Sequence, residues 1–369
     1  MVRFTLVVTL PDATPEGEPV YLSTDHDGWR PNDPDYRLQP RQDGRWQVTL
    51  DCPADRLLHF LFCRGNWDAV EVKADGSSLD ARRLRPQDGA RYPLRVARWA
   101  DTDLSTITGH VESFVDPSFR NGRRCWIYLP PGYEDGDRRY PVLYMHDGQN
   151  LFDKERSYAG EWEVDETLER MIPKGELPPI IVVGIENGGS ARMEEYTPWQ
   201  DAKWNSGGGG DRYLRAVADT LKPAIDAAYR TLADPRHTYM AGSSLGGLIS
   251  AYAGYAFGDV FQGGVAAVSP SYWWARDRFL DFARRAGRPT TRRFYQDMGT
   301  LESGSHEDEN HDGVEDSIAR LNAMREILVA SGMKEGRDLM SVEAKGDRHN
   351  ETYWSKRLPG LLKFLLADE

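Results

Sequence analysis

The chain has 369 residues, 40% of them hydrophobic, and a formal net charge of −12 at pH 7. A hydrophobic fraction of this size is enough for a sizeable core, and an acidic surface repels the phosphates of nucleic acids and of anionic membranes. We therefore exclude nucleic acid and membrane as partners. No run of about eighteen apolar residues is present, so no membrane span is expected, and the three cysteines form neither a zinc-binding pattern nor a disulfide framework.

The beginning of the sequence lacks the features of a targeting signal. The segment that follows Met1 is interrupted by Pro11 and Asp12, and it has no apolar signal core with a small-residue cleavage site. We expect a cytoplasmic protein, although a secreted form whose signal had been removed would have the same sequence.

Residues 1–100 contain short strand-like segments separated by turn signals. The segments are rich in β-branched, aromatic and other apolar residues and lie at 4–10, 20–22, 46–50 and 58–62. Asp-Gly pairs at 27–28, 43–44 and 88–89 favour turns between them. Short strands at this spacing predict a small all-β, immunoglobulin-like sandwich.

Three strings in this region resemble the starch-binding family of carbohydrate-binding modules: DHDGWRP at 25–31, DGRW at 43–46 and RGNWDAVE at 64–71. The resemblance implies glycan binding on aromatic faces, for which Trp29 and Trp67 are the candidates. Large aromatic side chains more often pack in a core, so a structural or pocket-capping role for the module is the alternative.

Residues 105–369 alternate between strand-like and helix-like segments, after a polar linker at 99–108. Such alternation is typical of an α/β fold with a mostly parallel sheet. Pro223 predicts a kink in the second of four helix-like segments, which lie at 163–171, 211–229, 314–330 and 351–366.

The string Gly-Ser-Ser-Leu-Gly-Gly at 242–247 follows a short apolar segment and leads into a helix-like stretch. Strand, sharp turn and helix form the context of a nucleophile elbow, which presents Ser244 above the edge of the sheet. The backbone N–H of Leu245 is the first predicted donor to an oxyanion. The second should come from the loop at 146–149, after the strand-like segment 143–145.

The acid and the histidine of an α/β hydrolase follow the serine along the chain. His349 takes the last place, just before the final helix, and would accept the proton of Ser244. Glu302 ends a strand-like segment and is the predicted acid. Three other carboxylates compete for this role: Asp297, Asp308 and Asp347.

Strings across residues 105–369 resemble the putative esterase family, which includes enterochelin esterases, esterase D, feruloyl esterases and the antigen 85 acyltransferases. They are YMHDGQNLFD at 144–153, IIVVGIEN at 180–187, RMEEYTP at 192–198, SPSYWW at 269–274, GTLE at 299–302 and HNETYW at 349–354. The resemblance implies an α/β-hydrolase fold, ester cleavage by a Ser244–Glu302–His349 triad, and Gln149 as the second oxyanion donor. Some siderophore esterases rely on a Ser-His dyad, which leaves the acid open.

Trp273, Trp274, Trp199 and Arg192 are the predicted substrate-binding residues, with core packing as the alternative for the three tryptophans. The acidic stretch 302–312 contains two histidines, but we interpret it as a solvated loop rather than a metal site. No metal and no cofactor are therefore expected.

We interpret the chain as a serine esterase with two domains, a carbohydrate-binding-module-like sandwich at 1–100 and a hydrolase domain at 105–369. The expected substrate is a small-molecule or oligosaccharide ester, such as a siderophore ester or an acylated carbohydrate, with polysaccharide as a further partner. The alternatives are an acyltransferase acting on a sugar and a carbohydrate-binding protein whose hydrolase domain is inactive. The acyl group, the alcohol and the oligomeric state stay open.

Overall fold

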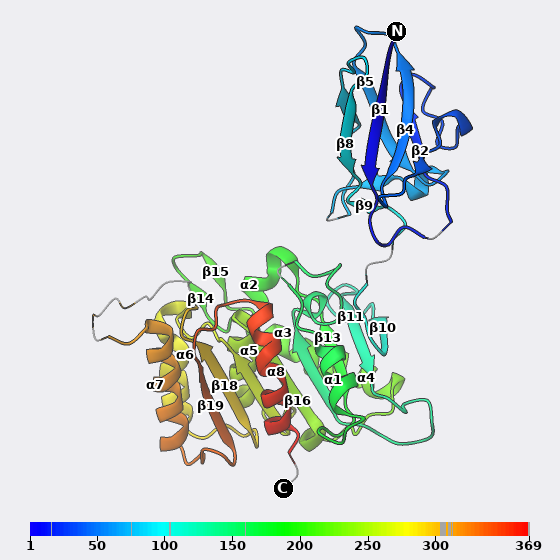
Figure 1. Cartoon of the computed structure of the whole chain (residues 1–369). Coiled ribbons are helices and arrows are strands. Elements are labelled where there is room, and N and C mark those ends of the chain that lie inside the picture. The colour runs from blue at the N-terminus through cyan, green and yellow to red at the C-terminus, as the bar shows by residue number, and fades with distance from the viewer. Residues whose placement is uncertain are drawn as a thin grey trace. The chain divides into compact units, whose positions relative to one another are not determined.

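The computed structural model describes residues 1–15, 17–74, 76–102, 105–158, 160–302, 308, 311 and 313–367. The chain divides into two units, Met1–Leu104 and Ser105–Glu369 (Figure 1). Among the described residues, no helix combines the length and the apolar character that crossing a membrane requires.

The first unit is all-β, as predicted. One sheet has the order β3-β4-β1-β8, with strands Gln39–Pro40, Trp46–Cys52, Val2–Thr9 and Arg91–Arg95. A second sheet has the order β2-β5-β7, with strands Tyr21–Thr24, Leu58–Cys63 and Arg82–Leu84, and a short ladder joins β6 (Glu71–Val72) to β9 (Arg98–Trp99). Phe4 and Leu6 of β1 share one buried cluster with Leu22 of β2 and Phe60 of β5, so the two sheets enclose a common core.

The second unit is built on an eight-stranded sheet of order β10-β11-β13-β12-β16-β17-β18-β19 (Figure 1). The strands are His110–Val115, Arg124–Leu129, Ile181–Ile185, Val142–His146, Thr238–Ser243, Gly264–Val268, Phe294–Gly299 and Leu339–Ala344. β11 pairs antiparallel with both β10 and β13, and all further pairs in this sheet are parallel. The central strands are buried along their whole length, which is why they are apolar runs rather than alternating patterns.

Helices cover both faces of this sheet and form two separate cores. One buried cluster joins the sheet to α3 (Gly210–Ala216), α4 (Lys222–Ala228), α5 (Leu245–Ala256), α6 (Trp274–Ala286) and α7 (Asp316–Ala330). The other joins it to α1 (Val164–Met171) and α8 (Glu351–Leu365). The predicted α/β-hydrolase architecture is thereby confirmed.

The predicted helix at 211–229 is interrupted immediately before Pro223. The interruption is a π-helical turn, η5 (Val217–Leu221), between α3 and α4. Pro223 lies in the first turn of α4, directly after this π-helical turn, so the residue without an amide hydrogen stands where the regular helical pattern is interrupted.

The carboxyl ends of the parallel strands β12, β16, β17, β18 and β19 meet at one edge of the sheet. The loops that follow these strands carry the predicted catalytic residues, and this edge is where α/β proteins bind their ligands. A small hairpin, β14 (Gln200–Asp201) and β15 (Ser206–Gly207), and the short helix α2 (Arg192–Glu195) lie at the same end of the unit (Figure 1).

Candidate active site

Ser244 lies between β16 and α5 in a conformation that few residues adopt. Its φ of 57° and ψ of −122° are costly for a non-glycine residue, and such strain is concentrated at functional sites. The turn is closed by glycine on both sides. A Cβ on Gly242 would lie 2.7 Å from the carbonyl oxygen of Gly246, and a Cβ on Gly246 would lie 3.1 Å from the Cβ of His146. These contacts explain why the elbow needs glycine at both positions.

The hydroxyl of Ser244 has a partner that the sequence analysis did not identify. Its Oγ lies 3.3 Å from the Oγ of Ser271, a buried residue whose amide donates to the carbonyl of Ser244. Among the described residues, the Ser244 hydroxyl forms this hydrogen bond to Ser271 and does not form one to His349. Catalytic hydrogen bonds are often long in a free enzyme and shorten when substrate binds.

His349 and Glu302 are joined by a direct hydrogen bond. The Nδ1 of His349 lies 2.5 Å from the Oε2 of Glu302, so the imidazole donates to the carboxylate. The ring of Trp354 packs edge-on against the imidazole at 5.0 Å. Histidine and acid are 47 residues apart in the sequence, and the loops after β18 and β19 bring them together.

Glu302 is also held by donors on its other oxygen. Its Oε1 accepts hydrogen bonds from the hydroxyl of Ser269 at 2.8 Å and from the amide of Gly299 at 2.5 Å. Burial opposes ionisation of this side chain, but the donors, His349 first among them, outweigh it and lower the pKa of Glu302. The carboxylate is therefore negatively charged and fixed in direction, as the acid of a triad must be.

The competing acids have other partners. Asp297 is fully buried, lies 3.1 Å from the guanidinium of Arg357, and accepts hydrogen bonds from Tyr295 and from the amide of Ser269; burial raises its pKa to about 6. Asp347 lies 3.6 Å from the same guanidinium.

Asp308 accepts from the amide of Gly313. Most of the acidic stretch that surrounds it, including His306 and Asp312, lies outside the described residues. Of the four candidate acids, Glu302 is the one that contacts His349 in the described structure.

Ser269 connects the acid to a buried cation. Its hydroxyl donates to Glu302 and accepts from the indole N–H of Trp354 and from Arg357, each at 3.0 Å. Its backbone φ of 41° is left-handed and aims the side chain at the acid loop. Ser269 and Trp354 belong to strings singled out in the sequence, whereas Arg357 carried no sequence signal because its role depends on contacts 88 residues away.

The predicted oxyanion donors come from two adjacent loops. Leu245 is the first residue of α5, where an amide has no acceptor inside the helix. Gln149 lies in η3 (Gly148–Asn150), directly after β12, which pairs with β16. The close approach of Gly246 to His146 places the beginning of α5 against the loop that leads to Gln149.

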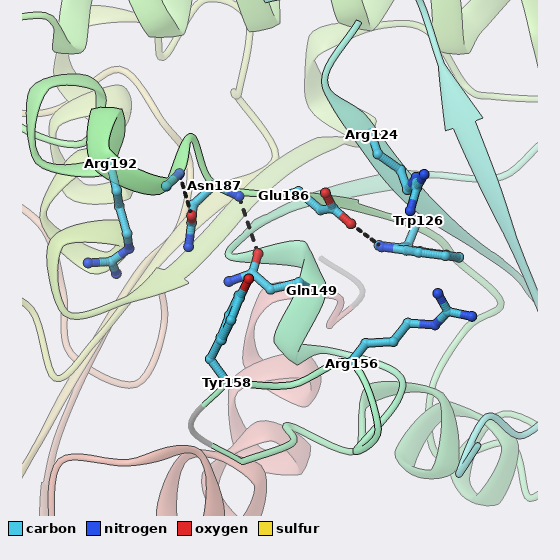
Figure 2. Close-up of a pocket in the computed structure, with 9 residues that line it drawn as sticks. Arg124, Trp126, Gln149, Arg156, Tyr158, Glu186, Asn187 and Arg192 are labelled. Carbon is cyan, nitrogen blue, oxygen red and sulfur yellow. Dashed lines mark hydrogen bonds between the residues drawn. The ribbon is translucent and has the colours of Figure 1, made fainter. Parts of the chain in front are cut away.

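A network of polar side chains fixes this loop. Arg192 forms two hydrogen bonds to Asp147, at 2.7 and 2.8 Å, and the side chain of Asn187 adds a third at 2.7 Å. The amide of Asn187 donates to the side chain of Gln149 at 3.2 Å (Figure 2). Arg192 therefore holds the loop, in addition to lining the neighbouring pocket.

That pocket has a volume of about 500 Å³ and is polar (Figure 2). We call it the arginine pocket; its lining residues are Arg124, Trp126, Gln149, Arg156, Tyr158, Glu186, Asn187, Gly189 and Arg192.

The predicted pocket tryptophans differ in their surroundings. Trp273 is 42% exposed and lines another hollow, of about 570 Å³, together with Trp204. Trp274 is buried, and its indole N–H donates to the carbonyl of Trp199 at 2.7 Å. Trp199 packs against Tyr252 and Phe282, so Trp274 and Trp199 have the contacts of core residues.

In the first unit, Trp67 is 42% exposed, and Trp29 is half-buried with a left-handed φ of 62°. A flat indole face on Trp67 is therefore accessible to a ligand.

One group of carboxylates in the described residues has a spacing that suits a metal ion. Oxygens of Glu161, Asp165 and Glu166 lie within 4.8 Å of one another, just before and within the first turn of α1. Burial raises the pKa of Glu161 to about 7 and that of Asp165 to about 8. Protons therefore relieve much of the repulsion in this group.

Comparison with known proteins gives the following similarities. The sequence model of the family described as "Putative esterase" matches residues 117–365. Uncharacterized protein YbbA of Bacillus subtilis is 28% identical over 249 residues, covering 66% of this chain and 92% of that protein. The iron(III) enterobactin esterase of Dickeya dadantii is 32% identical over 221 residues, covering 59% of this chain and 40% of the esterase.

The all-β region matches part of an α-amylase of Niallia circulans, with 37% identity over 98 residues; the match covers 26% of this chain and 8% of the amylase. The BES protein from Bacillus cereus has a similar fold, with a TM-score of 0.55 and 20% identity over 72% of this chain and 98% of that one.

Proposed function

The chain belongs to the putative esterase family and is a serine esterase, and from this premise we propose that Ser244, His349 and Glu302 form its catalytic triad. The observation that carries the proposal is the hydrogen bond between His349 and Glu302 at the sheet edge where the strained elbow presents Ser244. A serine hydroxyl is a weak nucleophile until an adjacent base removes its proton, and an imidazole aligned by a carboxylate is such a base.

The reaction proceeds in two halves. His349 accepts the hydroxyl proton through Nε2 while the Oγ of Ser244 attacks the ester carbonyl. The amides of Leu245 and Gln149 donate to the resulting oxyanion, and the positive end of the α5 dipole adds to this stabilisation. The tetrahedral intermediate expels the alcohol, which takes the proton from His349. Water then attacks the acyl-enzyme with the same assistance and releases the acid.

The proposed substrate is a polar ester, either a siderophore ester or an acylated carbohydrate. Similarity to an enterobactin esterase supports the first class. The resemblance of the first unit to part of an α-amylase supports the second, because a carbohydrate-bound ester would benefit from a glycan-binding module. If water accepts the acyl group from the acyl-enzyme, the reaction is hydrolysis, which we propose. If a sugar hydroxyl accepted it, the reaction would be acyl transfer.

Replacement of Ser244 by alanine tests the triad. We expect Ser244→Ala to reduce kcat for 4-nitrophenyl acetate by about 10⁶-fold, because the members of a triad act as a unit. Ser243→Ala is the matched control. Its side chain is buried at the end of β16 and takes no part in the chemistry, so most activity should remain.

Circular dichroism shows whether both variants are folded. Unchanged turnover by a folded Ser244→Ala variant would contradict the mechanism.

A further inference from the structure

The arginine pocket lies directly beside the proposed oxyanion loop. Gln149, whose amide is the second proposed donor, is also one of its lining residues (Figure 2). A substrate carbonyl bound at that amide therefore places part of the substrate in or near the pocket. The chemistry of the pocket wall then determines which ester is preferred.

Trp126 forms the centre of this wall and is held between two cations. The guanidinium carbon of Arg156 lies 4.5 Å from the ring centroid and that of Arg124 lies 5.6 Å from it. Figure 2 shows the two guanidinium groups on opposite sides of the indole. The indole N–H donates to Glu186 at 2.9 Å, which fixes the plane of the ring. Stacking and this hydrogen bond preorganise both arginines.

The three arginines of the pocket differ in whether they have an ion-pair partner. Three arginines line the pocket, but Glu186 is its one lining carboxylate among the described residues. Arg192 is neutralised by Asp147, and Arg156 by Asp153 at 2.9 Å. Within the described part of the chain, Arg124 has no ion pair. Arg124 can therefore bind an anionic ligand without giving up an ion pair to any of the described residues, whereas Arg156 and Arg192 each already have a carboxylate partner.

We propose that the arginine pocket binds an anionic group of the substrate, a carboxylate or a comparable oxyanion on either the acyl or the alcohol part of the ester. The proposal rests on the proposed function, which supplies the ester at Gln149. Arg124 and the outer nitrogens of Arg156 would donate to the anion, since guanidinium groups bind planar oxyanions through charge-assisted hydrogen bonds. Tyr158, which is 90% exposed, offers an aromatic surface at the same pocket.

Two matched pairs of esters test the proposal and locate the anion. 4-Nitrophenyl hemisuccinate and 4-nitrophenyl butyrate differ by a charge on the acyl part. 4-Acetoxybenzoate and phenyl acetate differ by a charge on the alcohol part. We expect kcat/KM to favour the anionic member of one pair by about tenfold, because a charge-assisted hydrogen bond contributes at least that factor. The preference should decrease as salt is added.

Variants of Arg124 connect this preference to the pocket. Arg124→Gln should remove most of the preference by increasing KM for the anionic ester far more than KM for the neutral ester, whereas Arg124→Lys should retain part of it. Arg284→Gln is the control, because Arg284 is an exposed arginine of α6 that pairs with Asp281 away from the pocket.

Equal kcat/KM for both members of both pairs would overturn the proposal, as would a preference that Arg124→Gln leaves intact. If no ester is cleaved at all, the proposed function fails instead. Calorimetric titration with succinate and with benzoate then still tests the anion site, since binding by the wild type and not by Arg124→Gln supports it and no binding contradicts it.

Discussion

At the scale of single residues, the choice of acid follows from hydrogen-bond geometry. Glu302 accepts from His349, Ser269 and Gly299, which use both carboxylate oxygens and lower its pKa. Asp297 is buried more deeply, but its charge is engaged by Arg357. Asp297 has a raised pKa and is already paired with Arg357, so we assign it a structural role and not that of orienting the imidazole.

Replacing each acid by its amide distinguishes these roles. Glu302→Gln should decrease kcat by about 10³- to 10⁴-fold, because the amide no longer stabilises the imidazolium or fixes its tautomer. Asp347→Asn is the matched control, because it makes the same acid-to-amide change at a partly exposed carboxylate, and it should retain most activity. Steady-state kinetics of the folded variants is the measurement. If Asp347→Asn or Asp297→Asn lost activity while Glu302→Gln stayed active, the aspartate concerned would be the acid of the triad and not Glu302.

At the scale of secondary-structure elements, β12 supports the nucleophile elbow through its last residue. His146 is buried, and its Nδ1 lies 3.0 Å from the hydroxyl oxygen of Tyr213 in α3. The imidazole ring of His146 lies where a side chain at Gly242 would be. The Cβ of His146 would likewise crowd a side chain at Gly246. A neutral imidazole therefore joins β12, β16, α3 and α5 beneath Ser244.

This packing predicts a dependence of stability on pH. Burial lowers the pKa of His146 from 6.5 to about 4, so between these values the unfolded chain binds a proton that the folded chain does not. Stability from this residue is complete above pH 6.5 and is lost as the pH falls towards 4. A shift of this size corresponds to about 3 kcal/mol of unfolding free energy.

Urea unfolding at pH 7 and pH 4.5 measures the effect. Compared with the wild type, His146→Gln should lose less unfolding free energy between the two pH values. The difference between the two proteins isolates this residue from buried acids such as Asp165, whose raised pKa acts in the opposite direction. Identical losses in both proteins would contradict the assignment.

The sequence predicted the elements that depend on local pattern and missed the contacts between distant segments. The elbow at 242–247 and the strand-like segments before it and at 143–145 were recognisable because glycine spacing and apolar runs are local properties. The π-helical turn was not, because Pro223 indicated an interruption of the helix but not its geometry. Arg357 supports Glu302 through Ser269. These three residues are far apart in the sequence, and no local sequence pattern indicates that they are in contact.

At the scale of the whole molecule, the chain combines a serine esterase unit with an all-β unit that resembles part of an α-amylase. Binding energy from a module remote from the chemistry increases the local concentration of a polymeric substrate without changing the reaction itself. We therefore expect the first unit to affect large carbohydrate esters and to leave small esters unaffected.

Retention of the full-length protein on insoluble starch tests this expectation. Trp67→Ala should reduce retention because it removes the exposed indole face, whereas hydrolysis of 4-nitrophenyl acetate should stay unchanged. Trp204→Ala is the matched control, since Trp204 is comparably exposed, at 46%, but belongs to the esterase unit. Absence of retention for the wild type on starch and on other polysaccharides would favour a structural role for the module.

Covalent labelling measures whether Ser244 becomes a nucleophile through His349. Diisopropyl fluorophosphate reacts with an activated serine, whose oxygen displaces fluoride from phosphorus. We predict that intact mass spectrometry detects one diisopropylphosphoryl group per chain, that peptide mapping assigns it to Ser244, and that His349→Ala is labelled far more slowly. A label on another residue that abolishes esterase activity, or equal labelling of Ser244→Ala, would show that Ser244 is not the nucleophile.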